Sequence, residues 1–193
     1  MFGHHLIFGA YGFWLPNDPR GSWSKFVGSY ELYLAGGKAT TTDAVESVAH
    51  NEHDIEHRRS AKLALLRPAV QFSLNQVQAI GCGLAEYVEK SSVILLACAI
   101  LPDHLHFVVA PHRLTIDKLA VQFKGSATRQ LLKEKLHPFQ HVDGKTPKCF
   151  AQREWNVELE SERQLENAIN YVEQNPVKAG LLKQIWPFVK TSL

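Results

Sequence analysis

The feature that most constrains the fold is a pair of short segments that lie far apart in the chain and complement each other chemically. Residues 102–106, with the sequence PDHLH, stand between apolar runs, which is typical of a tight turn followed by a β-strand. In a strand, residues i and i+2 point to the same face, so His104 and His106 are expected to aim two imidazoles at one point. In residues 171–176, with the sequence YVEQNP, a helix would place Tyr171 next to Asn175 on one face. The two segments predict a strand and a helix that bring their polar side chains together.

Hydrophobic periodicity predicts the order β-α-β-β-α-β, followed by one further helix. The expected strands are residues 4–10, 93–101, 104–110 and 148–158, and the first two helices are residues 73–90 and 115–136. The last helix is expected to follow Ser161 and to end at Asn175, because a residue before proline is disfavoured in the α region. This order is that of the ferredoxin-like split βαβ fold, in the α+β class. The tail at residues 186–188 is expected to pack back on the core.

The 193 residues are expected to form a single domain with an insertion at about residues 28–67. That stretch is polar and acidic, its periodicity is poor, and we expect a long loop with one helical piece around residues 43–57. A loop of this length in a compact domain is usually functional or mobile.

The cysteines and the chain start favour a cytoplasmic protein. Cys82 and Cys98 lie in apolar surroundings, which predicts buried thiols and a reducing compartment. The N-terminus lacks the basic and then apolar pattern of a signal peptide. The longest apolar run, residues 93–100, is too short to span a bilayer, so no membrane contact is expected.

The charge distribution favours a polyanionic partner. The net charge is only +2, but between Arg113 and Arg153 nine basic residues stand against three acidic ones. The expected nucleic-acid contacts on the helix at 115–136 are Lys118, Lys124, Arg129 and Lys133, and Tyr11 and Trp14 are candidates for stacking on unpaired bases. The alternatives are a solvated helix face for the basic residues and core or lid packing for the aromatic ones.

Two imidazoles, an amide oxygen and a phenol fit a one-metal site with a tyrosine nucleophile. His104, His106 and Asn175 would hold a divalent metal that polarises a scissile phosphate. Tyr171 would attack the phosphorus and form a covalent bond. Imidazole ligands suit Mn²⁺ better than Mg²⁺. Taken singly, each residue has an ordinary alternative: half-exposed histidines, a half-buried tyrosine, and an asparagine that ends a helix.

Three segments carry a resemblance to a known family. They are residues 101–109 (LPDHLHFVV), residues 171–181 (YVEQNPVKAGL), and the opening YGFWLP and DPRG at residues 11–16 and 18–21. The chain resembles the single-tyrosine HUH transposases of small insertion sequences, and most of all the REP-associated tyrosine transposases. Asn175 stands where related enzymes often carry glutamine.

This resemblance implies an antiparallel ferredoxin-like sheet with helices on one face plus a C-terminal helix that bears the tyrosine. It also implies Mg²⁺ or Mn²⁺, cleavage of single-stranded or hairpin DNA, and a covalent 5′-phosphotyrosine intermediate. Monomer and homodimer both remain open. The competing hypothesis is a domesticated protein that binds hairpin DNA or RNA without cleaving it.

Overall fold

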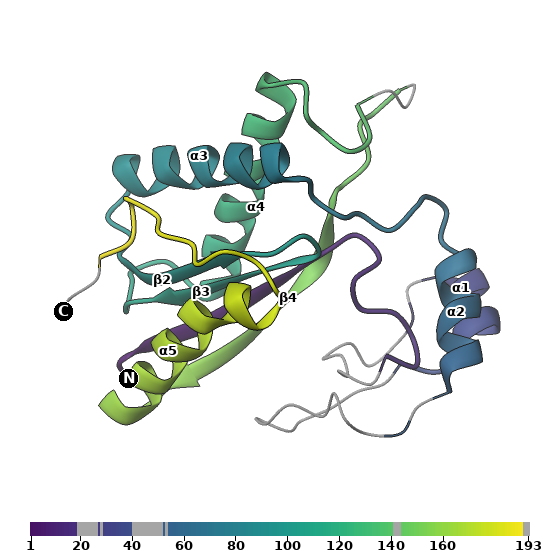
Figure 1. The fold of residues 1–193 in the computed structure, drawn as a ribbon, viewed down its shortest axis with the longest axis horizontal. Helices are drawn as coiled ribbons and strands as arrows, with labels where there is room; N and C mark the ends of the chain where they lie inside the picture. Colours follow the sequence, from purple (N-terminus) through teal and green to yellow (C-terminus); the bar gives the residue numbers. More distant parts are fainter. Residues whose placement is uncertain (19–26, 28, 40–51, 53, 141–143, 191–193) are drawn as a thin grey trace. The chain divides into compact units, whose positions relative to one another are not determined.

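A computed structural model of the chain describes residues 1–18, 27, 29–39, 52, 54–140 and 144–190 (Figure 1). The chain divides into two compact units. The larger one consists of Met1–Ala10 and Gln71–Leu193, and the smaller one of Tyr11–Val70.

The larger unit is built on a four-stranded antiparallel sheet in the order β2-β3-β1-β4. Its strands are β1 (Gly3–Ala10), β2 (Leu95–Ile100), β3 (His104–Val109) and β4 (Phe150–Leu159). Its helices are α3 (Leu74–Lys90), α4 (Ile116–Lys133) and α5 (Glu162–Lys178). The order of elements and of strands is that of the split βαβ arrangement, so the predicted fold class is confirmed.

An aromatic core joins α4 to one face of the sheet. Phe107 of β3 stacks on Phe123 of α4 with ring centroids 5.2 Å apart, and Phe8 of β1 lies 4.9 Å from Phe107. All three side chains are buried. Since side chains alternate along a strand, the neighbours of Phe107 must point to the other face.

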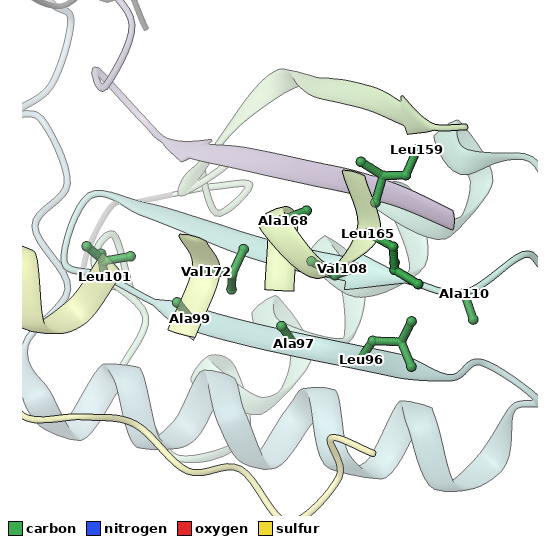
Figure 2. Close-up of a cluster of buried hydrophobic side chains, with 10 residues drawn as sticks. All are labelled: Leu96, Ala97, Ala99, Leu101, Val108, Ala110, Leu159, Leu165, Ala168 and Val172. Atoms are coloured by element: carbon green, nitrogen blue, oxygen red, sulfur yellow. The ribbon is translucent and has the colours of Figure 1, made fainter. Parts of the chain in front are cut away.

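The opposite face of the sheet is covered by α5 (Figure 2). Leu165, Ala168 and Val172 of α5 pack over apolar residues of β2, β3 and the end of β4. Two of the covered residues are Ala97 and Ala99, whose small side chains let the helix approach the sheet closely. His104 and His106 alternate with Leu105 and Phe107, so both imidazoles point to the face that carries α5, as the sequence predicts.

Helix α3 contains two glycines, although glycine has a low helix propensity. A Cβ on Gly81 would lie 2.3 Å from the indole of Trp186, and a Cβ on Gly83 would lie 2.7 Å from the carbonyl oxygen of Ser126 in α4. The helix is fixed at its start by Ser73 and Gln76, which form the predicted capping box. Both glycines therefore serve close packing, and the cap and the apolar stripe of α3 outweigh their cost.

The C-terminal tail packs back on the core, as expected. Val189 pairs with Leu95 in a parallel bridge along the edge of β2. The Gln184 side-chain amide donates to the carbonyl of Ile100 and accepts from its N–H, at 2.7 and 2.8 Å. These bonds partly cover the edge of the sheet.

The predicted end of the last helix is wrong, because α5 continues through Pro176 to Lys178. Proline fixes φ at a helical value, but outside the first turn of a helix it removes an N–H that would donate to the carbonyl four residues earlier. Here Pro176 is buried, and its carbonyl accepts from the N–H of Leu181 at 2.9 Å. Tertiary packing overrides the local preference, and Asn175 keeps the helical position that places it one turn from Tyr171.

The expectation of a buried Cys82 is also wrong, because this thiol is exposed whereas Cys98 and Cys149 are buried. Cys82 follows Ile80 by two residues, which puts it on the side of α3 away from the apolar stripe.

The smaller unit contains α1 (Tyr30–Gly36) and α2 (Ile55–Leu63). The two helices approach closely at Gly36, where a Cβ would lie 2.7 Å from the Cβ of Ala61. The helical piece predicted around residues 43–57 falls mostly outside the described residues, although α2 begins within it, capped by Asp54. In the described parts of the chain, no helix has the length and apolar character needed to cross a membrane.

Substitution of Gly83 by alanine is expected to destabilise the protein by about 1–3 kcal/mol, because the added methyl meets the backbone of α4. The matched control is Gly125→Ala in α4, where the new Cβ would meet only the flexible end of Arg129 at 3.2 Å. That change should be neutral or stabilising by about 0.5–1 kcal/mol. Urea denaturation of both variants measures the difference, and equal effects would contradict the packing argument.

Candidate active site

The centre of the candidate site is His106, which is 2% exposed. Both of its ring nitrogens have partners from other elements. Its Nε2 lies 3.0 Å from the side-chain nitrogen of Asn175 in α5, and its Nδ1 lies 3.0 Å from Nε2 of His5 in β1. A buried imidazole is stable only when such bonds replace water, so His106 ties the sheet to α5.

His5 is a member of the site that the sequence analysis missed. Its ring stacks on His106 with centroids 5.2 Å apart and meets the edge of Tyr171 at 5.7 Å. The sequence feature that could have indicated His5 is the pair of consecutive histidines in the first predicted strand. Only the pairing of β1 with β3 decides that His5, not His4, faces the same side of the sheet as His106.

Helix α5 brings the tyrosine and the asparagine to the imidazoles. The ring of Tyr171 lies 5.6 Å from that of His106, and its side chain is 46% exposed, which leaves it accessible to a large substrate. The ammonium of Lys178, two turns further along α5, lies 5.6 Å from the centre of the Tyr171 ring. The two motifs identified in the sequence therefore meet in the fold.

His104 is held from the turn that precedes β3. Its Nδ1 lies 2.6 Å from a carboxylate oxygen of Asp103, and its ring lies 4.8 Å from that of His106. A carboxylate on Nδ1 fixes the proton on that nitrogen, so Nε2 is the atom through which His104 would bind a metal.

Burial keeps the central histidines neutral. Burial, and then the neighbouring His104 and His5, hold the pKa of His106 well below its usual value. Burial alone lowers the pKa of His5 to about 4. Neutral imidazoles are the form that can bind a metal ion.

The donor set fits a divalent metal. The side-chain nitrogen of Asn175 lies 3.0 Å from Nε2 of His106, and turning this amide over would place its oxygen at the same distance from that ring nitrogen. Neighbouring ligand atoms around Mg²⁺ are also about 3 Å apart, given bonds of about 2.1 Å. Among the described residues, no group of three His, Cys, Asp or Glu side chains could hold a metal. The candidate set is therefore His104, His106 and Asn175, and His5 is not a fourth ligand because its Nε2 faces His106.

The predicted nucleic-acid contacts on α4 lie on the other face of the sheet, with Phe123. Lys118, Arg129 and Lys133 are exposed there. Lys124 is instead part of the packing: its ammonium pairs with Glu154 at 2.8 Å and donates to the carbonyls of Ala151 and Gln152. A phosphate contact by Lys124 would compete with these bonds.

The two aromatic candidates, Tyr11 and Trp14, belong to the smaller unit. Trp14 lies against Phe13, with ring centroids 4.9 Å apart, and Phe13 is buried. Phe13 thus serves packing.

The sheet order, the face that carries two imidazoles and the tyrosine-bearing helix define an α+β protein of the HUH type. Residues 73–175, more than half of the chain, match the family described as IS200-like transposases. The chain therefore belongs to the IS200-like transposase family, a class of DNA-processing enzymes with DNA as their partner. The matched range includes the His pair, Tyr171 and Asn175.

Two solved structures are similar to the chain. A REP-associated tyrosine transposase bound to a REP hairpin is 20% identical, with a TM-score of 0.46 over 64% of this chain and 70% of that one. A candidate transposase from Deinococcus radiodurans R1 is 12% identical, with a TM-score of 0.38 over 89% of this chain and 88% of that one. No curated protein matches the sequence.

The neutral buried histidines predict that acid destabilises the metal-free protein. His5 titrates at about 4 when folded and near 6.5 when unfolded, so the unfolded state binds more protons in between. Stability is then complete above pH 6.5 and falls as the pH drops towards 4, by about 2 kcal/mol at pH 5 from His5 alone. Urea midpoints measured in EDTA between pH 7 and pH 5 test this, and a flat profile would contradict it.

Proposed function

We propose that the chain is a metal-dependent, site-specific single-strand DNA endonuclease and strand transferase with Tyr171 as its nucleophile. The observation that supports this best is the 3.0 Å contact between His106 Nε2 and the Asn175 amide, because it unites the two motifs. Tyr171 reaches the same point, with its ring 5.6 Å from that of His106. A buried imidazole, an amide and an accessible phenol are the parts that a one-metal tyrosine nuclease needs.

The metal ligands in this proposal are His104, His106 and Asn175. A bound Mg²⁺ or Mn²⁺ would supply positive charge to the non-bridging oxygens of the scissile phosphate. Asp103 would accept a hydrogen bond from Nδ1–H of His104, which leaves the lone pair of Nε2 available to the metal, and Nε2 of His5 lies 3.0 Å from Nδ1 of His106.

Tyr171 would carry out the covalent step. Its phenolic oxygen loses its proton and attacks the phosphorus, the new oxygen–phosphorus bond forms, and the bond to the 3′ oxygen breaks. The leaving 3′ oxygen takes up a proton and becomes a free 3′-OH, while the 5′ phosphate stays on the tyrosine. Attack by another 3′-OH reverses these changes and joins the strands, so the phosphodiester energy is retained.

Lys178 would assist this step. Its ammonium lies over the Tyr171 ring, on the helix that carries the nucleophile. A cation there favours the developing phenolate and attracts the DNA phosphate.

The proposed substrate is single-stranded or hairpin DNA, in keeping with the family and the basic excess between Arg113 and Arg153. Backbone phosphates would meet the basic face of α4, and unpaired bases would stack on Tyr11 and Trp14. We retain the proposal that the whole chain acts as a single transposase domain with an insertion at about residues 28–67.

Tyr171→Phe is expected to abolish the covalent protein–DNA adduct and to leave DNA affinity within about threefold, since only the nucleophilic oxygen is lost. The assay mixes the protein and Mn²⁺ with single-stranded hairpin oligonucleotides copied from the DNA that flanks its gene, and scores adduct that survives SDS. Tyr87→Phe, on the opposite face in α3, is the matched control and should form adduct normally. Wild-type adduct levels in Tyr171→Phe would refute the assignment.

His104→Ala or Asn175→Ala is expected to lower adduct formation by at least about 100-fold at limiting Mn²⁺, with partial recovery at high Mn²⁺. The loss follows from the removal of one metal ligand, and circular dichroism should show an intact fold. Adduct that forms equally in EDTA would contradict metal dependence. Tight hairpin binding without adduct, under any metal, would instead favour the domesticated binder.

A further inference from the structure

We propose that His5 is a positioning residue of the candidate site: its Nε2 accepts a hydrogen bond from Nδ1–H of His106 and thereby fixes the tautomer and the ring orientation of this ligand. The inference rests on the proposed function, which makes His106 a ligand, and it adds a residue outside the ligand set.

The hydrogen-bond pattern around His106 carries the argument. A ring that binds a metal through Nε2 carries its proton on Nδ1, and in that tautomer the amide nitrogen of Asn175, 3.0 Å away, can donate to Nε2. Nδ1 lies 3.0 Å from Nε2 of His5, which is therefore the acceptor. His106 is thus held in the tautomer that a ligand bonded through Nε2 requires.

The alternative tautomer would require both partners of His106 to change. With its proton on Nε2, His106 would need the oxygen of the Asn175 amide turned towards it, and its Nδ1 would need a hydrogen bond from His5. The tautomer that leaves Nε2 available to a metal therefore depends on an acceptor at Nδ1, and within the described residues β1 supplies it through His5.

Packing also assigns His5 an orienting role. Its ring stacks on His106 and touches the edge of Tyr171, so it lies against the ligand and the nucleophile at once. His104 has a corresponding partner in Asp103. Each imidazole of the His pair is therefore oriented through Nδ1, one by a carboxylate and one by a neutral imidazole, and loss of such partners typically weakens metal binding about 10- to 100-fold.

The variants follow from this chemistry. His5→Leu removes the acceptor, whereas His5→Gln keeps an amide oxygen that can accept from Nδ1. His4→Leu is the matched control, because it removes an imidazole from the same strand whose Nδ1 lies 3.1 Å from Asn156 and which points to the other face.

Two readouts are needed. Mn²⁺ affinity of the DNA-free protein, followed by electron paramagnetic resonance, reports on the site without catalysis. Nitrogen-15 NMR of the histidines in the metal-free protein reports which nitrogen of His106 carries the proton.

We expect His106 to be protonated at Nδ1 in the wild type, His5→Leu to weaken Mn²⁺ binding about 10- to 100-fold, and His5→Gln to restore it to within about threefold. His4→Leu should bind Mn²⁺ normally. The proposal is overturned if His106 carries its proton on Nε2 in the wild type, a result that does not depend on any variant folding. It is also overturned if His5→Leu binds Mn²⁺ as tightly as the wild type.

Failure of the proposed function would look different. In that case the wild type would form no Tyr171-dependent adduct, while the tautomer of His106 and the effect of His5→Leu on Mn²⁺ binding would stand as expected.

Discussion

The arrangement of this site depends on one buried imidazole. His106 lies inside the interface between the sheet and α5, where an unsatisfied ring nitrogen would cost about 1–3 kcal/mol. Its bonds to Asn175 and His5 therefore fix three elements at once: β3, which carries it, α5 on one side and β1 on the other. The position of Tyr171 follows, because it is one turn away from Asn175 on the same helix.

The apolar packing beneath α5 makes this contact possible. Ala97 and Ala99 in β2 and Ala168 in the helix keep the helix close to the sheet, and Leu165 and Val172 fill the space between them (Figure 2). The helix also continues through Pro176, which keeps Asn175 in helical geometry at the point where its amide meets His106. A site of this kind needs a rigid support, and here the support is a helix docked on a complete antiparallel sheet.

The sheet separates two kinds of chemistry. The face under α5 carries the imidazoles and the tyrosine, whereas the face under α4 carries the aromatic core and, beyond it, an exposed row of basic side chains. Lys124 marks the division, since its ammonium is bonded to Glu154 and to two carbonyls at the start of β4. A lysine that looks like part of a basic stripe in the sequence is thus a link between α4 and the sheet.

The sequence by itself determined the order of strands and helices in the larger unit, the facing of His104 and His106, and the one-turn spacing of Tyr171 and Asn175, because periodicity and local spacing are properties of neighbouring residues. It misjudged the end of α5 and the exposure of Cys82, since burial of Pro176 and the outward side of α3 are set by packing. Only the tertiary structure decided that His5 joins the site and that Lys124 is already paired. Both depend on strand register and on contacts between residues about 30 to 100 positions apart, and no local pattern encodes these.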